Sequence, residues 1–123
     1  MEDRDMARLL AWGRIGIGIA GVLMPRMLAR IWTGTSQEEF PTNMLARGLG
    51  ARDIAIGAGL LAALEGAGSP RPWLQAGAAA DAADALGTLG SFSELGGLRA
   101  TALLVTEVGA TLLGLSLAEE LVG

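Results

Sequence analysis

The chain has 123 residues, of which 51% are hydrophobic, and its mean hydropathy is +0.46. It contains no cysteine and no histidine, so disulfides, iron–sulfur clusters, zinc sites, haem ligation by histidine and a Ser-His-Asp triad are excluded. The net charge of −4 and the lack of a basic patch argue against a nucleic-acid partner. We expect no cofactor, and the length predicts one domain over residues 1–123.

Small residues dominate much of the chain, which has 19 glycines and long alanine-rich stretches. In water this composition would weaken helices, because an interior glycine costs about 1 kcal/mol relative to alanine. In a bilayer the same residues allow helices to pack closely. The composition therefore favours an integral protein of the cell membrane. The acidic segment Met1 to Asp5 does not resemble a signal peptide.

Four long helices are predicted in chain order, and each is bounded by proline, glycine or a polar segment. The first runs from about Asp5 to Met24 and stops at Pro25. A short amphipathic helix over 25–32 follows, with Arg26 and Arg30 as interfacial anchors. A polar loop is then expected over 33–41.

The second long helix starts at a cap on Thr42 or Asn43 and runs to about residue 65. A glycine-, serine- and proline-rich turn over 66–72 leads to a third helix over about 73–89. A loop over 90–97 leads to a fourth helix over about 98–121. The sequence thus predicts an all-α, multi-pass protein: a four-helix transmembrane bundle with a short amphipathic helix after the first span.

Hydropathy alone leaves a soluble helical bundle as an alternative. A transmembrane helix usually needs about 18 or more apolar residues. The longest uninterrupted runs here, 15–25 and 54–64, have only 11 residues. Each segment reaches bilayer length only if charges are accepted inside it. The placement of those charges on the helices therefore decides between the two structures.

Each predicted long helix carries its mid-helix charge on a face of small residues. Residues at i, i+4, i+7 and i+11 share a face. The large aliphatic residues lie mostly off these faces, as in helices that turn bulky residues to lipid and charges to the bundle interior. The four faces comprise Ala7, Ala11, Arg14, Gly18 and Gly21; Gly48, Arg52, Ala55, Gly59 and Ala62; Gly77, Asp81, Asp84 and Thr88; and Ala100, Leu104, Glu107, Thr111, Gly114 and Ala118.

The mid-helix acids outnumber the mid-helix bases. The acids are Asp53, Asp81, Asp84 and Glu107, and the bases are Arg14 and Arg52, with Arg47 nearer a helix end. The excess charge predicts that one carboxyl group keeps a proton. Asp81 and Asp84 lie one turn apart and would repel each other when both are ionised, so we expect this pair to share it.

Two interpretations of these charges remain open. They can be structural ion pairs that hold the helices in register, or they can line a functional pocket, as intramembrane ionisable residues often do. In the functional interpretation the candidate catalytic residues are Asp81, Asp84, Arg52, Asp53, Glu107 and Arg14.

Three functions are compatible with such a pocket. The first is a membrane hydrolase or isomerase that acts on an apolar small molecule, for example by epoxide opening, with Asp81 and Asp84 as base and acid and Arg52 as the orienting charge. The second is an accessory or assembly subunit of a membrane complex, or a homo-oligomer. The third is a small proton-coupled transporter that uses Glu107.

Arginine counts do not orient the predicted bundle. An even number of spans places both termini on one side, together with Arg4, Arg8 and Arg71. The opposite side carries Arg26, Arg30 and Arg99. The positive-inside rule therefore gives a tie of three against three.

Three sequence motifs carry a resemblance to a known family. They are Gly13-Arg14 followed by Pro25, the segment from Ala46 to Asp53 (ARGLGARD), and the segment from Asp81 to Ala85 (DAADA). On these motifs, over roughly residues 9–89, the chain resembles a family of small four-helix membrane proteins that is common in high-GC bacteria and known only as a domain of unknown function. The resemblance implies a fold and a membrane location, and no catalytic residues.

Overall fold

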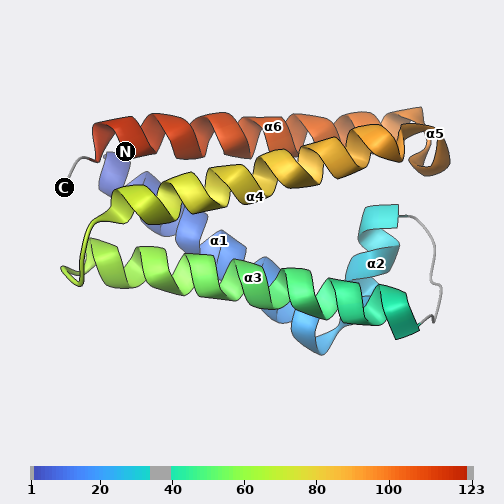
Figure 1. The fold of residues 1–123 in the computed structure, drawn as a ribbon, viewed down its shortest axis with the longest axis horizontal. Helices are drawn as coiled ribbons and strands as arrows, with labels where there is room; N and C mark the ends of the chain where they lie inside the picture. Colours follow the sequence, from blue (N-terminus) through green and yellow to red (C-terminus); the bar gives the residue numbers. More distant parts are fainter. Residues whose placement is uncertain (1, 34–39, 122–123) are drawn as a thin grey trace.

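Four long and two short helices form the part of the chain that the computed structural model describes, residues 2–33 and 40–121. The all-α prediction and the short helix after the first long one are confirmed. Successive long helices run in opposite directions, so both termini lie at one end and α2 and α5 at the other (Figure 1). The helices are α1 (Asp3–Leu23), α2 (Pro25–Thr33), α3 (Phe40–Leu64), α4 (Pro70–Gly90), α5 (Phe92–Leu95) and α6 (Gly97–Glu120).

Several helix boundaries differ from the predicted ones. The third long helix begins at Pro70 because the side chain of Ser69 accepts a hydrogen bond from the Arg71 N–H at 3.4 Å, and proline suits the first helical turn. The predicted loop over 90–97 contains the short helix α5, which ends at Gly96 with φ +84°. Helix α3 begins at residue 40, before the expected cap. Most of the predicted 33–41 loop lies outside the described residues.

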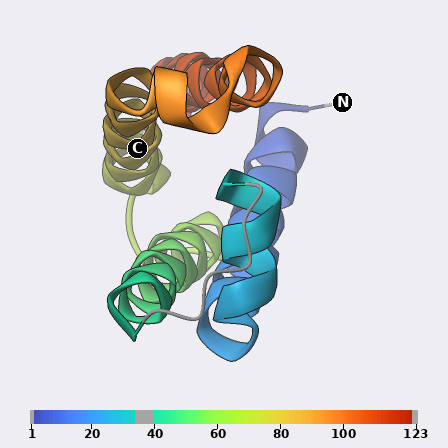
Figure 2. The ribbon, with the colours of Figure 1, turned by 90° about the vertical axis from the view of Figure 1, so that its right-hand side faces the viewer.

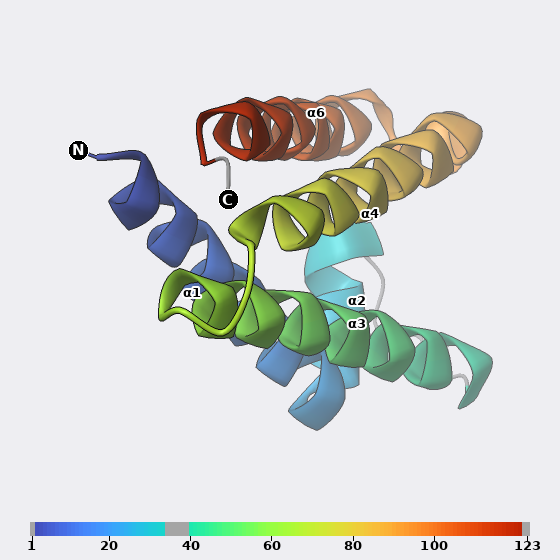
Figure 3. The ribbon, with the colours of Figure 1, turned by 60° about the vertical axis from the view of Figure 1, so that its left-hand side comes forward.

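The long helices associate as two pairs, α1 with α3 and α4 with α6. Figures 2 and 3 show the α4–α6 pair lying over the α1–α3 pair, whose two helices cross. Glycines allow the close crossing, since a Cβ atom on Gly18 would lie 2.5 Å from the carbonyl oxygen of Gly50. A Cβ atom on Gly57 would likewise lie 2.7 Å from the carbonyl oxygen of Ala11. These small residues bring the two backbones into contact.

The buried faces of three long helices match the predicted ones. In α1 the buried residues are those predicted, Arg14 among them. In α4, Gly77 and Thr88 are buried with Asp81 and Asp84 half-buried between them. In α6 the buried set includes Glu107, and the predicted residues that are not fully buried are half-buried. In each of these three helices the mid-helix charged residues therefore lie on the inward face, as the small-residue pattern predicted.

The predicted face of α3 is wrong. Gly48, Ala55 and Ala62 are exposed, and the residues of α3 that face inward are Ala46, Gly50, Asp53, Gly57, Leu60 and Leu64. The prediction depends on Arg52, which lies at the edge of the observed inward face. A long arginine side chain can reach the interior from a neighbouring position, whereas a short aspartate must sit on the inner face itself.

Large apolar side chains cover the outside of the molecule. Leu98 is 90% exposed, Leu23 71% and Leu86 70%. Helices α1 and α6 are long and apolar enough to cross a membrane, and only 22% of the relevant stretch of each is buried. Within the described residues α3 and α4 do not reach this apolarity, and each carries a pair of mid-helix charges.

Arginines from other helices bind the carbonyl groups at three helix C-termini. Arg4 donates to the Leu64 carbonyl oxygen at 2.7 Å, at the end of α3. Nε of Arg47 donates to the Val22 carbonyl oxygen at 3.3 Å, at the end of α1. Arg99 donates to the carbonyl oxygen of Ile31 near the end of α2. Each contact satisfies a carbonyl that has no partner within its own helix.

Candidate functional site

Five charged side chains form a chain of alternating sign in the interior. Along this charge chain lie Asp81 of α4, Arg14 of α1, Asp53 and Arg52 of α3, and Asp84 of α4. The exposed fractions of the side chains are 8% for Arg14, 13–17% for the three aspartates and 27% for Arg52. The charge chain therefore joins three helices through ion pairs that are largely shielded from solvent.

Arg14 binds Asp81 through two hydrogen bonds, of 2.6 and 3.2 Å, and binds Asp53 at 3.2 Å. Its Nη2 also donates to the carbonyl oxygen of Gly77 at 3.5 Å. A Cβ atom on Gly77 would lie 3.0 Å from this same Nη2. Glycine at this position leaves room for the guanidinium group to lie flat against α4 and reach Asp81.

Arg52 binds Asp84 through two parallel hydrogen bonds, Nη1–Oδ1 at 3.1 Å and Nη2–Oδ2 at 2.9 Å. This bidentate geometry is the strong form of an arginine–carboxylate contact. Arg52 also donates to Oδ1 of Asp53 from Nε at 3.4 Å and from Nη2 at 3.2 Å. One of the two N–H groups on Nη1 has no acceptor in the described part of the chain.

Asp53 lies at the centre of the charge chain, and its two oxygens differ. Oδ1 accepts hydrogen bonds from both Arg14 and Arg52. Oδ2 accepts none from any residue that the structure describes. Asp53 therefore combines a fixed orientation with one oxygen that is available to a bound molecule.

Glu107 is separate from the charge chain. It is 5% exposed, and its carboxyl group contacts the Thr88 hydroxyl at 2.7 and 3.1 Å. The same hydroxyl lies 3.0 Å from the Asp84 carbonyl oxygen. Of the four mid-helix acids, Glu107 is the one without an arginine partner among the described residues.

Asp81 and Asp84 do not hydrogen-bond to each other, and the sharing of a proton between them stays a prediction. Each carboxylate forms a bidentate pair with its own arginine, so neither needs the other as a hydrogen-bond partner. Arg47 is exposed and takes no part in the cluster, which leaves two arginines for four acids.

A cavity of about 180 Å³ lies beside one end of the charge chain. Its three charged lining residues are Arg52, Asp53 and Asp84, and the others are apolar or glycine. A cavity of roughly 150 Å³ can hold benzene, so this volume suits a ligand with a single small ring. The apolar lining consists of Ile17, Leu28, Ala29, Leu45, Ala46, Leu49 and Gly50.

The structure divides the six candidate residues into three groups. Arg52, Asp53 and Asp84 line the cavity, and Arg14 and Asp81 are joined to them through Asp53 but do not line it. Glu107 lies apart, on α6. The contribution of α2, through Leu28 and Ala29, was not foreseen, although the amphipathic pattern of this segment indicated a buried side.

The fold and site define a small all-helical protein with an internal ion-pair chain beside an apolar cavity. Within the described residues, no group of carboxylates is arranged to hold a metal ion. Comparison of the chain with family models, with curated proteins and with solved structures finds no match.

Proposed function

We propose that this is a multi-pass protein of the cell membrane that performs acid–base chemistry on a small apolar molecule. Its outer surface of leucine, isoleucine and valine side chains supports the membrane location, as do the apolar helices α1 and α6. In this arrangement α3 and α4 also cross the bilayer, with their charges turned inward and paired.

The observation that carries the catalytic proposal is the apolar cavity that ends on Arg52, Asp53 and Asp84. Ligand sites are typically apolar clefts with a few convergent polar groups. A substrate with an apolar body and one oxygen function would bury its body against Ile17, Leu28 and Leu49. Its oxygen would then lie at the charged end.

The free hydrogen-bonding groups assign the roles. Oδ2 of Asp53 accepts no bond within the described chain, so Asp53 is the proposed general base. The remaining N–H of Arg52 is the proposed donor to a developing oxyanion. Asp84 holds the Arg52 guanidinium group in place through its two bonds and is a positioning residue. These roles differ from the sequence-based assignment of Asp81 and Asp84 as base and acid.

Two reactions fit this arrangement. In an isomerisation, Asp53 removes a proton from the carbon next to a carbonyl group while Arg52 binds the enolate oxygen, and the proton returns to a different carbon. In epoxide opening, Asp53 takes a proton from water as the water oxygen attacks a ring carbon. The carbon–oxygen bond breaks, Arg52 binds the alkoxide, and the proton passes to that oxygen to give a diol.

The test is an activity assay on the purified protein in detergent. The substrates are a small cyclic epoxide and a β,γ-unsaturated cyclic ketone, with product formation followed by gas chromatography. We expect Asp53→Asn and Arg52→Lys to lose at least about a hundredfold in turnover, the usual scale for a general base or an oxyanion donor. The matched control is Asp5→Asn, which alters an exposed aspartate of α1.

Turnover in Asp53→Asn equal to that of the unmodified protein would refute the assigned base. Helical content by circular dichroism separates lost chemistry from lost folding in either variant. If the unmodified protein converts neither the epoxide nor the ketone, the enzyme proposal as a whole is refuted.

An accessory-subunit role is supported by a separate observation. The exposed side of α3 carries Gly48, Ala55 and Ala62, residues small enough for another helix to approach closely. In that case the protein should copurify from mild detergent with a second subunit or with another copy of itself. A monomeric species at all protein concentrations, with no stable partner, would argue against it.

A further inference from the structure

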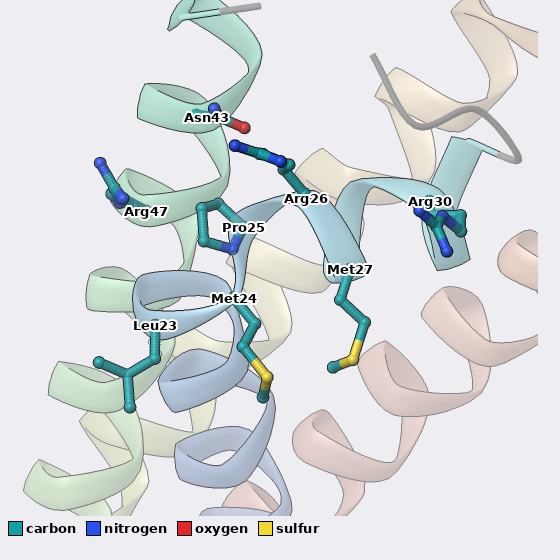
Figure 4. Close-up of a pocket in the computed structure, with 8 residues that line it drawn as sticks. All are labelled: Leu23, Met24, Pro25, Arg26, Met27, Arg30, Asn43 and Arg47. Carbon is teal, nitrogen blue, oxygen red and sulfur yellow. The ribbon is translucent and has the colours of Figure 1, made fainter. Parts of the chain in front are cut away.

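A second and larger cavity, of about 480 Å³, lies where α1 ends and α2 and α3 meet. Figure 4 shows its lining side chains, which come from all three helices. The lining residues are Leu23, Met24, Pro25, Arg26, Met27, Arg30, Asn43 and Arg47. We call this the arginine pocket. It is distinct from the apolar cavity, since the two have no lining residue in common.

Three of the nine arginines of the chain line this pocket, and none of its described lining residues is acidic. They come from two helices: Arg26 and Arg30 lie one turn apart on α2, and Arg47 lies one turn after Asn43 on α3. The Nε group of Arg47 is fixed on the Val22 carbonyl oxygen, which leaves its Nη groups for a ligand. The positive charge of the lining therefore favours an anionic ligand.

The pocket also has a polar acceptor. Oδ1 of Asn43 is buried and has no hydrogen-bond partner among the described residues. A buried acceptor without a partner is costly, so it indicates that a donor binds there. Figure 4 shows Asn43 and Arg26 facing each other on one side of the pocket. A hydroxyl group beside the anion would satisfy this oxygen.

The other side of the pocket is apolar. Leu23, Met24 and Met27 are 71%, 48% and 42% exposed. In Figure 4 the methionine side chains extend away from Asn43, along the side of the bundle. An amphiphile placed here would have its anionic group among the arginines and its hydrocarbon beside these residues.

We propose that the arginine pocket binds the phosphate group of an anionic phospholipid whose headgroup carries hydroxyls. The inference rests on the membrane location proposed above but not on the proposed enzymatic activity. Arginine binds phosphate through paired hydrogen bonds, and basic pockets between membrane helices are typical sites for anionic headgroups. The glycerol or sugar hydroxyl of the headgroup provides the donor that Asn43 lacks.

The experiment is native mass spectrometry of the detergent-purified protein with equal amounts of phosphatidylglycerol and phosphatidylcholine. We expect phosphatidylglycerol to be retained in preference. Arg30→Gln and Arg47→Gln should each weaken this retention about fivefold, the effect of losing one arginine contact at a membrane surface. Arg71→Gln, an exposed arginine at the opposite end of the bundle, is the matched control and should retain the lipid like the unmodified protein.

Two further arms separate a lipid from a soluble phosphate. Inorganic phosphate and glycerol 3-phosphate are added in excess, and neither should displace phosphatidylglycerol. Displacement by either compound would show that the site takes free phosphate and would overturn the lipid assignment. Equal retention of the two lipids, or an equal loss in Arg71→Gln, would overturn the site.

Unchanged melting temperatures establish that the variants are folded. The membrane location is tested independently, by whether the protein stays in membranes during alkaline carbonate extraction. A protein that stays in the membrane but shows no lipid preference would refute the arginine pocket alone.

Discussion

The contact between α1 and α3 predicts that two alanine substitutions on α1 change the free energy of unfolding in opposite directions. In Gly18→Ala the new Cβ atom would lie 2.5 Å from the Gly50 carbonyl oxygen and 2.7 Å from Cγ1 of Ile54. Because the first obstacle is backbone, the helices must move apart. Overpacking of this kind costs about 1–3 kcal/mol, and alanine returns at most about 1 kcal/mol of helix propensity. Taking the upper end for a backbone collision, we expect a net loss of about 2 kcal/mol.

The matched control is Gly16→Ala, two residues earlier. A Cβ atom there meets nothing within 4 Å, so only the gain in helix propensity, about 0.5–1 kcal/mol, is expected. The free energy of unfolding is measured by titration with SDS in mixed micelles, followed by circular dichroism. If Gly18→Ala stabilises the protein as much as Gly16→Ala does, the close helix crossing is wrong.

The remaining predictions concern the charges and the topology. Arg14→Met should lower the free energy of unfolding by about 3–5 kcal/mol in the same titration, because it leaves the shielded carboxylate of Asp81 without a partner and removes one of the two arginines that bind Asp53; a loss below about 1 kcal/mol would contradict the charge chain. Glu107→Gln should change stability far less than Asp81→Asn, because only Asp81 binds an arginine; equal losses would refute this difference. The chain has no cysteine of its own, so Ala67→Cys and Ser93→Cys, at opposite ends of α4, can be labelled in intact cells. An impermeant thiol reagent should reach one and not the other, and labelling of both from outside would exclude a membrane-spanning α4.

The inward faces of α1, α4 and α6 could be predicted because each carries a charge amid glycine, alanine or threonine. The face of α3 could not, because two adjacent charges of opposite sign, Arg52 and Asp53, competed to define it. Helical spacing gives each of them a different face. The inward face is the one that carries the short side chain, Asp53. The hydrophobic pattern of the sequence does not show that the longer Arg52 can reach the interior from the neighbouring face.

The pairing of the charges was beyond sequence reasoning for a different reason. Asp81 and Asp84 lie close together along α4, which suggested repulsion. In the structure α1 and α3 each insert an arginine against α4, and the two acids turn to separate partners. Which arginine meets which acid depends on how far each helix is rotated and shifted along its neighbour. Local spacing contains no information about these quantities.

The apolar cavity depends on the same kind of long-range placement. Its wall includes Leu28 and Ala29 of the short helix α2, which folds back against α3. The sequence predicted that α2 exists and is amphipathic, but not which surface it would cover.

The position of Arg14 has a consequence for biosynthesis. Its partner Asp53 comes 39 residues later and Asp81 comes 67 residues later, so α1 emerges from the ribosome before either of them does. An arginine at the centre of a lone membrane helix costs about 2.5–3.5 kcal/mol at the translocon. In the proposed membrane topology α1 therefore gains from staying beside the translocon until α3 brings Asp53, and the two helices would enter the bilayer together as a hairpin. The ion pair that orders the finished interior would thus also set the order in which its helices are inserted.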